Sequence, residues 1–301
     1  MEDYLQESDG KAADLVPTIS YMALRRARTT IEDFVQSYFS YHDLRVPEDF
    51  FRLLDIMIFV EGTIYAMDEE NERLAAEGKV EATHVLQGER VLLRVLRRRR
   101  LLTPQLEAQL RQGKEYWRME RELCAAMLQH PGGRCTAFQL DDVHVCSSGK
   151  SFDYRVLNLL LYALRRRNPD QQLLEFLAVD EALVDIGDDL VDYEDDVLKN
   201  SFNIYRGYVH LFAEEAQLKL VERISHLEAR HRALLRNLPE AVRMHFHARH
   251  SQASAVPGSG DWVFPRAILC EAAFREACAG DTSSSDSEQR TGSAARVASG
   301  V

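Results

Sequence analysis

The chain has 301 residues, of which 46% are hydrophobic and 28% are charged, so it is long enough to bury a substantial core. Its formal net charge of -11 argues against nucleic acid as the main partner, because binding to phosphate backbones depends on concentrated lysine and arginine. The five cysteines form no CxxC pair, and an odd number does not fit a framework of disulfides, which favours a reducing compartment.

Neither the first residues nor the apolar runs indicate targeting or membrane insertion. The opening stretch "MEDYLQESDGKAADLVP" is acidic and lacks the apolar region of a secretory signal. The longest apolar runs, such as "VLNLLLYAL" at residues 156–164, are too short to span a bilayer. We therefore expect a soluble, cytoplasmic protein without a transmembrane segment.

Apolar residues recur at helical spacing through most of the chain, and strand-like alternation is scarce. The spacing predicts helices over residues 22–39, 50–67, 85–96, 106–128, 152–164, 173–198, 202–238 and 263–274. Residues 130–151 are expected to be mostly loop, and the end of the chain, rich in Ser, Gly and Ala, has almost nothing to bury. The prediction is an all-α protein, with a flexible N-terminus over residues 1–14, one helical domain over 15–279 and a disordered tail over 280–301.

The segment "VDIGDDLVDYEDDVLKNSFN", residues 184–203, carries seven carboxylates within twelve residues. On a helix that turns by about 100° per residue, six of them share one stripe. These six are Asp185, Asp188, Asp189, Asp192, Asp195 and Asp196. Like charges three and four residues apart repel each other, and no lysine or arginine is interleaved to relieve them, so the stripe favours a cation. A hard cation such as Mg²⁺ would suit it, and a solvated acidic surface helix is the alternative.

Part of this segment, "DDLVDYEDD" at residues 188–196, resembles the second metal-binding motif of class I terpenoid synthases, (N/D)D(L/I/V)x(S/T)xxx(E/D). Asp188 and Asp189 match its opening pair and Asp196 its closing acid, whereas Asp192 stands where the family usually has Ser or Thr. The resemblance implies that Asp188, Asp192 and Asp196 are metal ligands, at the positions i, i+4 and i+8 that a helix places along one side.

An acidic cluster also follows the apolar helix expected over residues 50–67. Asp68, Glu69 and Glu72 form DExxE, a degenerate version of the first motif of that family, DDxx(D/E). The resemblance implies that these three residues bind metal and face the second motif across a cavity. Solvation of a helix end is the alternative. Within the helix, Glu61 interrupts the apolar run and is expected to line a polar cavity or to pair with a buried arginine.

The family holds its diphosphate with basic residues near the second motif. Arg155, Lys199 and Arg206 are the candidates here, with ordinary surface contacts as the alternative for each. Two features of the family are missing. Asp195 occupies the position before the closing acid, where the family often has Lys, and the C-terminal Arg-Tyr pair is absent, Arg266 being the nearest candidate.

The resemblance implies a helical bundle of the isoprenoid synthase superfamily around a central cavity. Its activity would be that of a lyase dependent on Mg²⁺, or on Mn²⁺, that ionises a prenyl diphosphate to a carbocation. The resemblance is also compatible with a homodimer of this chain. One alternative is a catalytically reduced scaffold of the same fold that acts as a binding protein. Another is a di-iron carboxylate bundle that uses "EATH" at residues 81–84 and "EARH" at residues 228–231.

Overall fold

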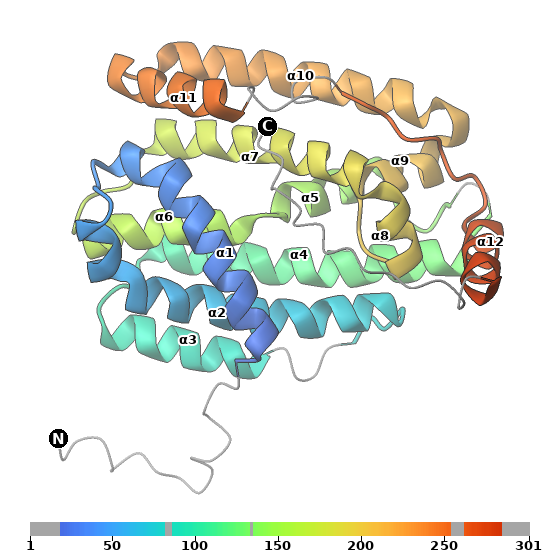
Figure 1. Ribbon diagram of the computed structural model, residues 1–301, viewed down its shortest axis with the longest axis horizontal. Coiled ribbons are helices and arrows are strands. Elements are labelled where there is room, and N and C mark those ends of the chain that lie inside the picture. The colour runs from blue at the N-terminus through green and yellow to red at the C-terminus, as the bar shows by residue number, and fades with distance from the viewer. Residues whose placement is uncertain (1–18, 82–85, 133–134, 254–261, 285–301) are drawn as a thin grey trace, which may run out of the picture. The chain divides into compact units, whose positions relative to one another are not determined.

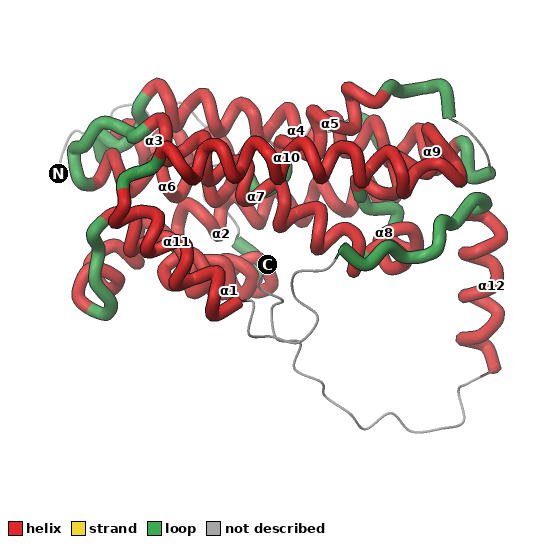
Figure 2. Tube along the Cα trace, turned by 90° about the horizontal axis from the view of Figure 1, so that it is seen from above, coloured by secondary structure: helices red, strands yellow, loops and turns green. Residues whose placement is uncertain are grey.

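The structure is a computed structural model that describes residues 19–81, 86–132, 135–253 and 262–284. Within these ranges the chain forms helices joined by loops, and the β-pairing is limited to an isolated bridge between Gly132 and Cys270. Figure 2 accordingly shows red helices and green loops, without a yellow strand in the described part of the chain. The prediction of an all-α protein is confirmed.

The chain divides into two compact units. The first contains Met1–Leu74, Glu81–Gly113 and Phe152–Pro169, and the second contains Ala75–Val80, Lys114–Ser151 and Asp170–Val301. The boundary falls inside two helices, α2 and α4, each of which has residues in both units. The prediction of one helical domain over residues 15–279 stays a prediction.

The first unit is built from α1 and the helices that follow it. Its elements are α1 (Tyr21–Tyr38), the short 3-10 helix η3 (Phe39–His42), most of α2 (Glu48–Ala76), α3 (Leu86–Arg98), the start of α4 (Pro104–Gln129) and α6 (Phe152–Leu164). The Ser20 side chain caps α1 by accepting a hydrogen bond from the Ala23 N–H at 2.9 Å. The hydroxyl of Tyr154 on α6 donates to Asp33 on α1 at 2.8 Å, which fixes these two helices to each other.

The second unit contains the remaining helices. These are the end of α4, α5 (Leu140–Gly149), α7 (Gln171–Val191), α8 (Tyr193–Lys199), α9 (Ile204–Phe212), η4 (Ala213–Glu215), α10 (Ala216–Asn237), α11 (Glu240–Ala253) and α12 (Glu271–Ser284). In Figure 1, α10 lies along α7, and the contacts of α10 also extend to α9, which α5 contacts as well. Their apolar faces form one core that includes Cys124, Val143, Tyr193 and Leu220, each almost completely buried.

The expectation that residues 130–151 are mostly loop is wrong for residues 140–149, which form α5. The N–H of Gln139 donates to the Asp142 carboxylate at 2.8 Å, and the N–H of Val143 donates to the Gln139 carbonyl, so the helix begins with satisfied backbone groups. Val143 and Cys146 are fully buried. This short apolar face stabilises a helix that is too brief to produce a clear periodic pattern.

Two helices that the pattern predicts as continuous are divided. The helix predicted over 173–198 is interrupted at Asp192, and the one predicted over 202–238 is interrupted at Ala213, whose φ is 52°. The helix predicted over 263–274 is wrong up to Cys270, since α12 begins at Glu271. Helix α12 continues to Ser284, so the first residues of the expected tail are helical, and α11 is a helix that the pattern did not predict. Residues 1–14 and 285–301 lie outside the described residues.

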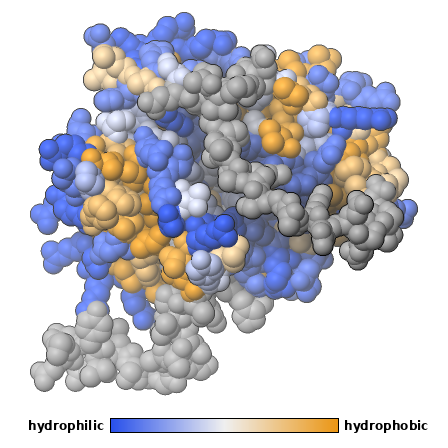
Figure 3. Space-filling model, in the orientation of Figure 1, coloured by the Kyte–Doolittle hydropathy of each residue, from blue (hydrophilic) through white to orange (hydrophobic). Residues whose placement is uncertain are grey.

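The visible surface mixes polar and apolar residues. Figure 3 shows blue, hydrophilic residues between separate orange patches on the face seen in Figure 1. Among the described helices, none combines the length and the apolar character that crossing a membrane would require.

Candidate functional site

The acidic segment belongs to the second unit, at the junction of α7 and α8. Asp170 caps the start of α7 by accepting hydrogen bonds from two backbone N–H groups, and the helix runs to Val191. At the junction, Asp192 has φ -90° and ψ 5°, which departs from helical geometry. Its N–H still donates to the Asp188 carbonyl at 2.8 Å, and its carbonyl accepts from the Asp196 N–H at 2.8 Å. Helical hydrogen bonds therefore link Asp188, Asp192 and Asp196, although α8 turns away from the direction of α7 (Figure 1).

The bend divides the acidic stripe into a buried part and a more exposed part. Asp185 and Asp189 are buried, at 7% and 2% exposure. Asp188 and Asp196 are half-buried, and Asp192 is exposed. Within this stripe, the three carboxylates that the resemblance implies as ligands are therefore more exposed to solvent than the buried pair. Asp195 is also exposed.

The buried carboxylates bind groups from the end of α5. The ammonium group of Lys150 donates to the Asp189 carboxylate in a short ion pair, and the Ser151 hydroxyl donates to Asp185 at 2.7 Å. Burial alone would lower the pKa of Lys150, but the negative charges of Asp189 and Asp185 raise it well above its ordinary value. Part of the counter-charge that the stripe needs therefore comes from a lysine 39 positions away in the sequence. Local spacing gave no sign of it.

Asn203 connects the two parts of the segment. Its side-chain amide donates to the Asp196 carboxylate at 2.9 Å and to the backbone carbonyl of Asp189 at 2.5 Å. Burial raises the pKa of Asp196 to about 6, and the negative charges of Asp189 and Asp192 act in the same direction. The negative charge of the Asp196 carboxylate is therefore poorly balanced by its neighbours, and a second positive charge close to it would stabilise the ionised form.

The two basic candidates of this unit have different surroundings. Lys199 is exposed and lies 3.9 Å from the Asp195 carboxylate. Arg206 is completely buried, and its guanidinium donates to Glu271, to the Asn200 side chain and to the Ser201 carbonyl. In this conformation the guanidinium holds α12 onto α9 and has no exposure to solvent through which a diphosphate could approach.

The first acidic motif belongs to the first unit, where helix α1 supplies its partners. The guanidinium of Arg26 lies 3.0 Å from Asp68 and 3.1 Å from Glu72, and the Ser20 hydroxyl donates to Glu69 at 2.7 Å. The same guanidinium lies 4.4 Å from the centre of the Tyr65 ring, a cation-π distance. All three acidic residues of the motif therefore have internal partners. Arg26 is the main one, and no motif in the sequence marks it.

Glu61 and Arg155 also lie in the first unit. Glu61 is fully buried, and burial, reinforced by the nearby carboxylate of Asp153, raises its pKa well above the ordinary value. Glu61 therefore lies in the interior as a carboxyl group that favours its neutral form. Arg155 is half-buried on α6 and has a partner in the structure.

Within the described ranges, no group of three or more His, Cys, Asp or Glu side chains is arranged to hold a metal ion. Of the di-iron motifs, residues 82–85 lie outside the described part. In the other motif, His231 pairs with Asp180 at 3.0 Å and Glu228 accepts a hydrogen bond from the Trp262 indole at 3.0 Å. These two side chains therefore have protein partners.

No protein-family model, curated protein or solved structure matches the chain. The resemblance to class I terpenoid synthases therefore depends on the two acidic motifs and on the all-α architecture.

Proposed function

We propose that the chain is a Mg²⁺-dependent protein of the class I terpenoid synthase type, which ionises a prenyl diphosphate at the α7–α8 segment. The observation that supports this most directly is that Asp188, Asp192 and Asp196 lie on successive hydrogen-bonded turns, with carboxylates that are exposed or half-buried. Their oxygen atoms are the ligands that Mg²⁺ and Mn²⁺ prefer. Mg²⁺ often binds through one or two carboxylates together with substrate phosphates, so the site does not require a preformed cage of protein ligands.

In the proposed reaction, the bond between the allylic carbon and the diphosphate oxygen breaks, and its electron pair leaves with the diphosphate. The metal would supply positive charge that neutralises this leaving group. Asp188, Asp192 and Asp196 would hold the metal ion. The exposed ammonium group of Lys199 lies on the same short helix as Asp196, so Lys199 is the basic residue best placed to contact the diphosphate. Loss of a proton from the resulting carbocation, or capture by water, would complete the reaction.

The test compares two double variants that remove the same charge from the same segment. Asp188→Ala with Asp192→Ala removes proposed ligands, whereas Glu194→Ala with Asp195→Ala removes two exposed carboxylates without a proposed role. Each protein is incubated with Mg²⁺ and prenyl diphosphates of several chain lengths, and hydrocarbon and alcohol products are measured. We expect the control variant to retain activity and the ligand variant to lose it. Equal activity of the two variants would contradict the proposal.

A helical binding scaffold without catalysis is the second candidate, and the pairing of Arg26 with Asp68 and Glu72 favours it. A carboxylate that already has an arginine partner must give it up before it can bind a metal ion. Calorimetric titration of the chain with Mg²⁺ and an unreactive prenyl thiolodiphosphate separates the candidates. Binding that depends on Asp188 and Asp192 supports the first candidate, and absence of binding supports the scaffold.

A further inference from the structure

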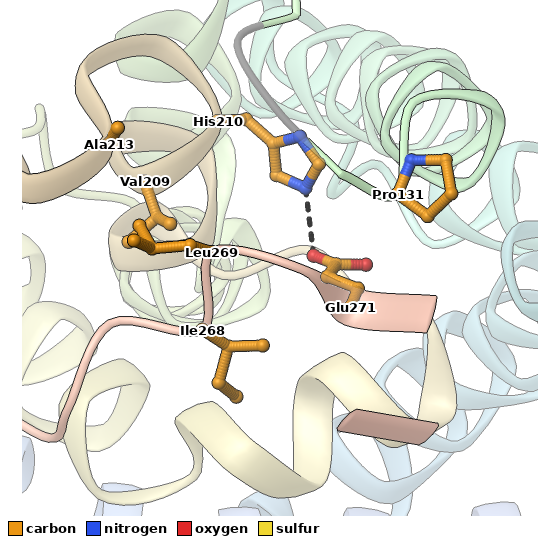
Figure 4. A pocket seen from close by; sticks show the side chains of 7 residues that line it. All are labelled: Pro131, Val209, His210, Ala213, Ile268, Leu269 and Glu271. Atoms are coloured by element: carbon orange, nitrogen blue, oxygen red, sulfur yellow. Dashed lines mark hydrogen bonds and ion pairs between the residues drawn. The ribbon is translucent and has the colours of Figure 1, made fainter. Parts of the chain in front are cut away.

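Two features of the chain lie outside the carboxylates of α7 and α8, and they differ in how well their charges are balanced. A pocket of about 290 Å³ in the second unit is lined mainly by apolar residues, and Figure 4 shows His210 and Glu271 joined at its wall by a contact of 2.8 Å. The Glu271 carboxylate also accepts hydrogen bonds from Arg206 and Arg275, so its charge is balanced within the protein. One end of the first unit instead concentrates positive charge on its surface.

Three segments that are distant in the sequence form this end, which we call the basic end of the first unit. They are residues 43–55, residues 97–107 and residues 165–167. Figure 1 shows the start of α2, the end of α3 and the end of α6 together at the left of the picture. Ion pairs also connect the segments, since Arg99 lies 3.8 Å from Asp55 and Arg167 lies 3.4 Å from Asp43. The segments therefore form one continuous surface.

The charge of this surface is opposite to that of the chain. The three segments contain nine arginines and five carboxylates, so their formal charge is +4, whereas that of the whole chain is -11. Eight of the nine arginines are exposed. Arg45, Arg100 and Arg166 are among these, and their side chains form no ion pair within the described part of the chain. The surface thus presents arginines that are available to an anionic partner.

Large apolar side chains are exposed on the same surface. Phe51 is 71% exposed and Val46 is 60% exposed. On α2, Phe51 directly precedes Arg52 and lies one turn before Asp55, the partner of Arg99, so the exposed ring has arginines near it. Exposed apolar groups that are bordered by charged residues mark interaction sites. A partner for this surface has to offer anions and an apolar environment side by side.

We propose that the basic end of the first unit binds the surface of an anionic lipid membrane, with its arginines at the lipid phosphates and with Phe51 and Val46 inserted between the headgroups. A membrane surface places phosphates and hydrocarbon within about 5–10 Å of each other, which matches this combination of side chains. Clusters of basic residues are typical of proteins that bind anionic lipids. Nucleic acid would satisfy the arginines but offers no apolar layer for Val46. The proposal needs no transmembrane helix and does not depend on the function proposed for the α7–α8 segment.

The experiment measures sedimentation of the full chain with lipid vesicles of two compositions. One contains equal parts of phosphatidylserine and phosphatidylcholine, and the other contains phosphatidylcholine alone. We expect the chain to bind the anionic vesicles at least about tenfold more tightly, and to bind them more weakly as the salt concentration rises. Equal binding to both compositions, or binding to neither, would overturn the proposal.

A pair of double variants shows whether this surface or the overall charge determines binding. Arg45→Gln with Arg100→Gln removes two exposed arginines of the basic end, and we expect the dissociation constant for the anionic vesicles to rise at least about tenfold. The control, Arg25→Gln with Arg236→Gln, removes the same charge from two exposed arginines outside the three segments and is expected to bind like the wild type. The same loss in both double variants would contradict the proposal.

The apolar contribution is tested with Phe51→Ser, which we expect to weaken binding to the anionic vesicles at least about tenfold. The control is Tyr21→Ser on α1, whose side chain is 78% exposed, and it is expected to leave binding unchanged. Because both side chains are exposed, neither replacement removes core packing. A single-stranded oligonucleotide is titrated in parallel. Unchanged vesicle binding in Phe51→Ser, or tighter binding of the wild type to the oligonucleotide than to the anionic vesicles, would each overturn the proposal.

Discussion

The guanidinium of Arg206 and the carboxylate of Glu271 form a two-pronged ion pair, with Nε 2.7 Å from Oε1 and Nη2 2.8 Å from Oε2. The two side chains are 0% and 3% exposed, and they lie 65 positions apart in the sequence. The pair joins α9 to the first residue of α12. It also orients His210, which shares the same carboxylate. A single buried carboxylate therefore organises both a structural contact and the polar side of a pocket.

Replacing Glu271 by Gln is expected to lower the free energy of unfolding by about 3–5 kcal/mol, because it leaves the Arg206 charge buried without a counter-charge. Urea unfolding followed by circular dichroism measures the change. The matched control is Glu175→Gln, which removes the partner of Arg230 from a pair of similar length, 2.8 Å, with both side chains 51% exposed. We expect the control to change the free energy of unfolding by less than about 1 kcal/mol. Similar losses in both variants would show that Arg206 does not depend on this partner.

The same carboxylate predicts how stability depends on pH. The pKa of Glu271 is lowered to about 2 in the folded state, below its ordinary value of 4.5, so the folded state binds this proton less readily than the unfolded state. Its stabilising contribution is complete above about pH 4.5 and is lost as the pH falls toward 2. We expect the difference in unfolding free energy between the wild type and Glu271→Gln to shrink over this range. A difference that stays constant from pH 6 to pH 3 would contradict the assignment.

The positions of the long helices could be predicted because their apolar faces are extended. The predicted helix over residues 152–164 coincides with α6, and the one over 106–128 falls within α4. The interruption at Ala213 could not be predicted, because alanine favours helices and nothing in its neighbourhood signals a φ of 52°. Helix α5 was missed for the opposite reason, since two buried residues, Val143 and Cys146, stabilise it without producing a long repeat.

The acidic motifs could be found from spacing, but their partners could not. Lys150 reaches Asp189 across 39 positions, and Arg26 reaches Asp68 across 42. These contacts depend on how helices pack, and no local pattern encodes that packing. The repulsion along the acidic stripe was nevertheless an informative signal, because it predicts that positive charge is needed there, and Lys150 supplies part of it.

The cysteines give a prediction that tests burial directly. Cys124, Cys135 and Cys146 are buried, whereas Cys270 is exposed and Cys278 is half-buried. Burial raises the pKa of the Cys124 and Cys146 thiols, which reduces their reactive thiolate form further. With a thiol reagent such as Ellman's reagent, we expect two groups to react in the native protein and five in urea.

The double variant Cys270→Ser with Cys278→Ser provides the control for that count. Its native state is expected to react slowly, and three thiols are expected to appear on unfolding. Rapid reaction of a third thiol in the native wild type would show that one of the buried cysteines is accessible.

The ion pair of Lys150 and Asp189 gives a prediction for metal binding that also tests the proposed function. Lys150→Gln removes the positive charge next to Asp189, so the α7–α8 segment becomes more negative and its carboxylates should attract Mg²⁺ more strongly. We expect the dissociation constant for Mg²⁺ to fall several-fold, and the melting temperature of this variant to rise more with added Mg²⁺ than that of the wild type, because a ligand that binds the folded state stabilises it. The matched control is Lys199→Gln, which removes the same charge from an exposed position 3.9 Å from Asp195 and is expected to have a smaller effect. A melting temperature that does not respond to Mg²⁺ in any of the three proteins would argue that the carboxylates of this segment are a solvated acidic surface, whose internal partners already satisfy the buried ones.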